Sequence, residues 1–143
     1  ELTIENTTNQ QKQLQLAAAA LLIELSRADY KQDQQEQLTI ESALKKSFSL
    51  KEQQLNELIE LAEAENQSAT SLFQFTKLIN DHYSAEQRFE LIKMLWQVAI
   101  ADGEISKYED HLIRRISDLI YLPHSEFIRA KLTTLNANSS DYK

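Results

Sequence analysis

Hydrophobic residues recur at three- and four-residue steps along most of the chain, a spacing that gathers them on one face of an α-helix. The first stretch of this kind predicts a helix over residues 9–28, with Leu14, Leu21 and Leu25 on its apolar face. Its uninterrupted apolar run, Leu16–Ile23, has eight residues, whereas about 20 are needed to cross a bilayer. We therefore expect a core helix and no membrane span.

Capping-box patterns, in which an N-cap acceptor is followed three positions later by Glu or Gln, mark four further helix starts. They begin at Asp33, Ser49, Ser84 and Ser106. A polar stretch before Leu72 and the single proline mark two more boundaries. The helices predicted after the first therefore cover residues 33–47, 49–62, 72–79, 84–99, 106–120 and 124–135, and residues 136–143 are expected to form a disordered tail.

The composition supports an all-α fold. The chain of 143 residues contains one glycine and one proline, so it has few of the positive-φ turns that hairpin-rich β folds need. A chain of this length fits one domain that buries roughly 70% of its unfolded surface. We predict about seven helices in one compact bundle. The helical spacing of the aromatic residues predicts that they pack in its core: Phe73, Phe75, Phe89, Trp96 and the tyrosines.

A short pattern occurs twice, 73 positions apart. Ala28-Asp29 is followed by Glu36 and Ile40, and Ala101-Asp102 is followed by Glu109 and Ile113. Each copy follows an apolar helical stretch, so each falls at a corner between two helices. The repeat predicts a single domain with pseudo-two-fold symmetry, in which halves 9–65 and 84–135 are joined by a connector helix.

The two corners are candidate metal ligands. If the halves face each other, Asp29, Glu36, Asp102 and Glu109 could bring four carboxylates together. Hard cations prefer such oxygen ligands, and calcium takes six to eight of them. No cysteine is present, and the three histidines are too far apart for a helical ligand pair. A bound ion would therefore be calcium or magnesium, outside an EF-hand loop, since neither corner has that motif.

Helix capping explains part of the same pattern without a metal. Glu36 and Glu109 stand where a capping-box carboxylate reaches back to the N-cap amide, and a negative charge in a first turn suits the helix dipole. Asp29 and Asp102 fit capping less well, because a carboxylate near a helix C-terminus opposes the dipole by about 0.3–1 kcal/mol. Both interpretations stay open.

Charge and motifs exclude several function classes. The net charge is −7, and the basic residues are scattered apart from Lys45-Lys46 and Arg114-Arg115, which argues against nucleic-acid binding. No nucleophile elbow or glycine-rich phosphate loop occurs, so we predict no enzymatic activity and no catalytic residue. A metal-dependent hydrolase that uses the corner carboxylates is the last-ranked alternative. His82, His111 and His124 are expected to face solvent or to form local hydrogen bonds.

The chain resembles the TerB-like family of tellurite-resistance proteins. The resemblance is carried by Leu95-Trp96-Gln97-Val98-Ala99-Ile100-Ala101-Asp102-Gly103-Glu104, by Glu109 and by Leu112–Leu119. Phe75–Asn80, ahead of Arg88, is similar to the longer bacterial branch of that family. The similarity extends over most of the chain.

The resemblance implies a helical fold with internal two-fold character, a candidate ion site at paired acidic corners, and no catalytic activity. The site would use Asp102 and Glu109 in one copy and Asp29 and Glu36 in the other. The first copy departs from the pattern, since Tyr30-Lys31 replaces Gly103-Glu104. A stress-related, cytoplasmic interaction module is expected, with other proteins as partners, and peripheral association with a membrane, for instance through those partners, stays open. A purely structural partner-binding module without metal is the alternative.

Overall fold

The computed structural model describes residues 2–27, 34–68, 72–101 and 105–140. These residues form seven α-helices and no strand, which confirms the predicted all-α fold class. In chain order the helices are α1 (Leu2–Arg27), α2 (Gln34–Phe48), α3 (Glu52–Ser68), α4 (Leu72–His82), α5 (Ala85–Ala99), α6 (Lys107–Leu119) and α7 (His124–Ser140).

Helix boundaries differ from the predicted ones at several places, among them the end of α3, which reaches Ser68 rather than residue 62, and the end of α4, which reaches His82 rather than residue 79. α1 begins at Leu2 rather than near residue 9, and α7 runs on to Ser140, past the start of the expected tail. The box expected at Ser49 does not form. Instead Ser49 takes a left-handed φ of 53° where α2 ends, and Lys51 N donates to Gln54 Oε1 at 2.9 Å at the start of α3.

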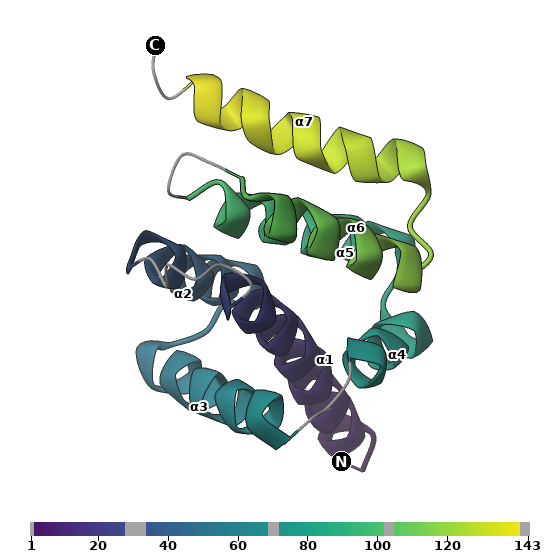
Figure 1. Ribbon diagram of the computed structural model, residues 1–143. Helices are drawn as coiled ribbons and strands as arrows, with labels where there is room; N and C mark the ends of the chain where they lie inside the picture. Colours follow the sequence, from purple (N-terminus) through teal and green to yellow (C-terminus); the bar gives the residue numbers. More distant parts are fainter. Residues whose placement is uncertain (1, 28–33, 69–71, 102–104, 141–143) are drawn as a thin grey trace.

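α1 is the central element of the bundle. It crosses the molecule diagonally in Figure 1 and packs against α2, α3, α4, α5 and α6. α3 and α4 flank it, while α5 and α6 lie across one end and α7 forms the outermost layer above them. α4 also contacts α6, so it connects the two halves as predicted.

The helix packing follows the internal repeat. A shift of 73 positions places α2 on α6, and the neighbours of α1 and α5 correspond: α1 contacts α2 and α3, as α5 contacts α6 and α7. Exchanging the two halves turns the contact between α1 and α6 into a contact between α5 and α2, and both contacts are present. Equivalent residues are buried in both halves, since Ile40, Ile113, Leu22 and Leu95 are fully enclosed.

Most of the described aromatic residues lie in the core, as predicted. Trp96, Phe75 and Phe89 are buried, and Trp96 packs on Phe127 with ring centroids 5.5 Å apart. The prediction is wrong for Tyr108 and Tyr121, which are 70% and 77% exposed. Tyr108 lies in the first turn of α6 on its outer side, and Tyr121 follows the end of that helix. The side chains of Tyr30, Phe73 and Tyr142 lie outside the described part.

Candidate functional site

The structure describes one of the four predicted metal-ligand side chains. Asp29 and Asp102 fall in segments 28–33 and 102–104, outside the described residues. Glu36 lies in the first turn of α2, and its side chain is likewise outside the description. Glu109, in the first turn of α6, is fully described. That the four carboxylates meet therefore stays a prediction.

Glu109 belongs to a complete capping box at the start of α6. The N-cap residue Ser106 has extended backbone angles, with φ −72° and ψ 160°. Its hydroxyl accepts a hydrogen bond from Glu109 N at 3.1 Å, and Ser106 N donates to Glu109 Oε1 at 3.0 Å. Two backbone amides that an isolated helix start leaves unpaired are satisfied in this way. The capping interpretation is thus confirmed for this residue.

Capping uses only one of the two carboxylate oxygens. Glu109 is fully buried, and within the described part of the chain its Oε2 atom has no hydrogen-bond partner. A buried polar atom left unpaired costs about 1–3 kcal/mol, and more for a charged group. Within the described part of the chain, Glu109 Oε2 is therefore used neither by the cap nor by any other hydrogen bond.

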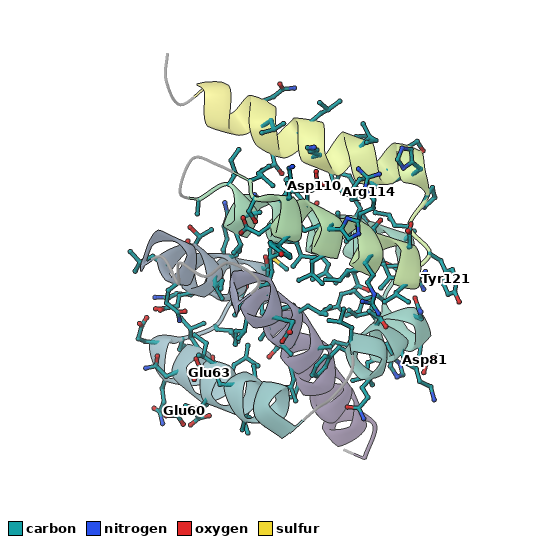
Figure 2. The ribbon with its side chains drawn as sticks, viewed as in Figure 1. Glu60, Glu63, Asp81, Asp110, Arg114 and Tyr121 are labelled. Carbon is teal, nitrogen blue, oxygen red and sulfur yellow. The ribbon has the colours of Figure 1, made fainter. Side chains whose placement is uncertain are left out.

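Two nearby basic side chains lie close to Asp110, the residue that follows Glu109 in the sequence. Asp110 lies 3.9 Å from the Arg114 guanidinium and 4.0 Å from Lys131 Nζ, as measured from its two carboxylate oxygens. Figure 2 shows Asp110 and Arg114 side by side where α6 meets α7. Among the described residues, the ion pairs of this region thus involve Asp110, while Glu109 is buried. In the described part of the chain, no group of three His, Cys, Asp or Glu residues is close enough to hold a metal.

The start of α5 provides an internal comparison for Glu109. Ser84 and Gln87 form the same box, with Ser84 N donating to Gln87 Oε1 at 2.8 Å and Gln87 N donating to Ser84 Oγ at 3.1 Å. Gln87 is exposed, whereas Glu109 is buried. Because an amide completes this box as well as a carboxylate does, capping alone does not require an acid at position 109.

Described residues close to the two corners line one surface hollow. Leu38, from the beginning of α2, and Gln97, from the last turn of α5, both border a hollow of about 620 Å³ between these helices. The segments 28–33 and 102–104 adjoin the same two helix ends. That the two corners face each other stays a prediction.

Other residues singled out in the sequence have structural positions. His82, His111 and His124 are exposed, as expected. Sequence reasoning did not find the burial of Glu109, because a capping-box acid is usually solvated. It also did not find that Arg88 joins three helices, although the position of Arg88 after Asn80 was part of the family resemblance.

The family model described as "Tellurite resistance protein TerB" matches residues 15–132. The chain belongs to the TerB family. The matched region of this TerB domain includes both acidic corners and most of the seven helices. The comparison with curated proteins found no match, and neither did that with solved structures. Among the described helices of the TerB domain, none is both long and apolar enough to span a bilayer.

Proposed function

We propose that this TerB domain is a non-enzymatic protein-interaction module that holds a calcium or magnesium ion at its acidic corners. The observation that carries the proposal is the Oε2 atom of Glu109, which is enclosed in the protein and has no partner among the described residues. A cation is the natural partner for such an oxygen, because hard divalent ions take carboxylate ligands. Asp102, Asp29 and Glu36 are the further ligands proposed from the repeat.

The ion would act on the structure of the domain. It would neutralise carboxylates where α1 meets α2 and where α5 meets α6, and so fix the angle between the two halves. Ions that bind only the folded state stabilise it by about 2.7 kcal/mol at a hundredfold excess over the dissociation constant. The proposal includes no catalytic residue, and it keeps the cytoplasmic location expected for such a module.

Thermal unfolding with calcium or magnesium tests this proposal. At saturating ion the midpoint of the wild-type chain should rise by several degrees relative to a sample in chelator. Asp102→Asn should abolish most of that rise. Glu109→Gln should do the same while keeping the capping box, since Gln87 completes the equivalent box of α5. Asp118→Asn, an exposed change later in α6, is the matched control and should keep the full rise.

A purely structural module without metal is the second candidate. It is favoured by the completed capping box, which already gives Glu109 Oε1 a role. This alternative predicts no midpoint shift with either ion, and the same midpoint for Asp102→Asn with and without chelator. That pair of results would remove the ion from the proposed function and leave the interaction module.

A further inference from the structure

Three surface hollows adjoin one another around the C-terminal half of α2. The first, between α2 and α5, is the hollow bordered by Leu38 and Gln97. It shares Ser47 and Met94 with a second hollow of about 500 Å³ above α1. The second shares Phe48 with a third of about 440 Å³ between α1 and α3. We call these three adjoining hollows together the α2 groove.

The surface that lines the second hollow of the α2 groove is mostly apolar. Leu14, Phe48, Leu91 and Met94 contribute to the second hollow, and the only methionine of the chain, Met94, receives the Ser47 hydroxyl on its sulfur at 3.0 Å. Two of the large hydrophobic side chains that remain exposed border the groove, Leu38 at 55% and Leu61 at 59%. Apolar side chains concentrated in a concave surface are typical of a binding site.

The charges of the groove differ from those of the rest of the chain. Its lining contains three lysines and two glutamates, a balance of +1, whereas the whole chain carries −7. Within the described residues, Lys12, Lys46 and Lys93 take part in no ion pair. Glu90, by contrast, interacts electrostatically with Arg129. The lysines are therefore available to an anionic partner.

We propose that the α2 groove binds an amphipathic helix of a partner protein, with the apolar face of that helix on the groove floor and acidic residues along its flanks. α2 rises about 14 Å between Leu38 and Ser47, so with the second hollow the groove has room for about three helical turns. Helix-in-groove binding uses apolar anchors at i, i+3, i+4 and i+7, and the lysines supply charge complementarity. This inference deepens the proposed function, because it assigns the surface of the interaction module.

Two other partners fit the groove less well. An extended strand gains affinity by adding to a sheet edge, and the described part of this protein has no strand. A flat anionic bilayer could reach the lysines but not the concave floor, and most of the remaining surface charge would be repelled by it. The concave, apolar and locally basic surface favours a narrow acidic helix.

Selection from a library of helical peptides tests the proposal. The library holds the four apolar anchors constant and varies the flanking positions among Glu, Lys and Ser, with the full chain as bait. We expect Glu-flanked peptides to be enriched, and the best of them to bind Lys46→Glu/Lys93→Glu at least tenfold more weakly. Lys46→Glu alone changes an exposed residue and serves if the double variant does not fold. Lys77→Glu, an exposed change on α4, is the matched control and should bind as wild type does.

Three results would overturn the proposal that the α2 groove binds an acidic amphipathic helix. No enrichment of Glu over Lys at the flanks, or equal affinity of wild type and Lys46→Glu, would overturn the proposal. So would binding of the chain to anionic phosphatidylglycerol vesicles that the same lysine changes abolish, since the lysines would then serve a membrane. Peptide binding is measured in chelator and with calcium. Loss of the ion response in Glu109→Gln with peptide binding intact would concern the metal site alone.

Discussion

The guanidinium of Arg88 donates a hydrogen bond to the backbone carbonyl oxygen of Asn80 at 3.0 Å, and so joins α5 to the end of α4. A second guanidinium nitrogen donates to Ile120 O at 3.1 Å, just after α6, and Asn80 Nδ2 donates to Leu119 O at 2.8 Å. Carbonyls at helix C-termini lack intrahelical partners and carry partial negative charge. One arginine therefore satisfies two helix ends and fixes the connector helix between the halves.

Replacing Arg88 by methionine should lower the free energy of unfolding by about 1.5–3 kcal/mol, because hydrogen bonds from a charged group are lost while the aliphatic stem stays. Urea denaturation measures the change. Arg115→Met alters an exposed arginine on α6 and should shift stability by about 0.5 kcal/mol or less. Equal effects at the two positions would show that the Arg88 contacts contribute nothing.

Replacing Tyr121 by glycine should increase the stability of the folded protein. Its φ of 58° lies in the left-handed region, where a residue with a Cβ atom is disfavoured by about 1–2 kcal/mol. Leu122 N donates to Ser117 O at 3.1 Å across this residue, the Schellman arrangement that favours glycine. After the entropy that glycine adds to the unfolded chain, Tyr121→Gly should raise stability by about 0.5–1 kcal/mol.

Tyr108→Gly is the matched control for that change. Tyr108 is similarly exposed but lies within α6, where glycine costs about 1 kcal/mol. Thermal melting should therefore move up for Tyr121→Gly and down for Tyr108→Gly. A decrease for both would mean that the left-handed turn stores no strain.

Ionisation of the Tyr83 phenol should lower the free energy of unfolding at alkaline pH. Its hydroxyl donates to Leu14 O at 2.9 Å, and burial raises the pKa of the Tyr83 phenol well above its usual value near 10. The folded state thus keeps this proton where the unfolded chain loses it, so the stabilisation is complete below pH 10 and declines as pH rises above 10.

Comparison with Tyr83→Phe isolates that effect. The variant should be less stable than wild type by about 1 kcal/mol at pH 8, because the hydrogen bond is lost. The difference should shrink by about 1 kcal/mol per pH unit above pH 10, as followed by urea denaturation. A gap that stays constant to pH 11 would show that Tyr83 ionises normally in the folded protein.

In chelator, Glu109→Gln should leave the free energy of unfolding unchanged or raise it by about 1 kcal/mol. The amide preserves the capping box, and burying an unpartnered amide costs less than burying an unpartnered carboxylate. Ser106→Ala, by contrast, removes the cap itself and should cost about 1 kcal/mol, as Ser84→Ala should on α5. A loss above 1 kcal/mol for Glu109→Gln would assign the carboxylate a structural partner.

The sequence predicted the helices well because each carries its own local signals. The apolar spacing is confirmed by the buried core, and the boxes at Ser84 and Ser106 are confirmed by their capping hydrogen bonds. The prediction was wrong at Ser49. The sequence pattern there is that of a start for α3, but Ser49 takes the left-handed conformation that ends α2. Local patterns do not decide between two helix ends that share one turn.

Burial was less predictable than helix content. Glu109 reads as an ordinary first-turn acid, and its enclosure follows from packing between elements distant in sequence. Tyr108 and Tyr121 have helical spacing but lie on the outer side or after the end of α6. The α2 groove likewise arises where four helices meet, and no single segment encodes it.

Isothermal titration of calcium and magnesium into wild type and Glu109→Gln tests the central claim most directly. The account predicts saturable binding of at least one ion to wild type, at least tenfold weaker binding to Glu109→Gln, and unchanged binding to Asp118→Asn. Absence of binding to wild type, or equal affinity for wild type and Glu109→Gln, would contradict it.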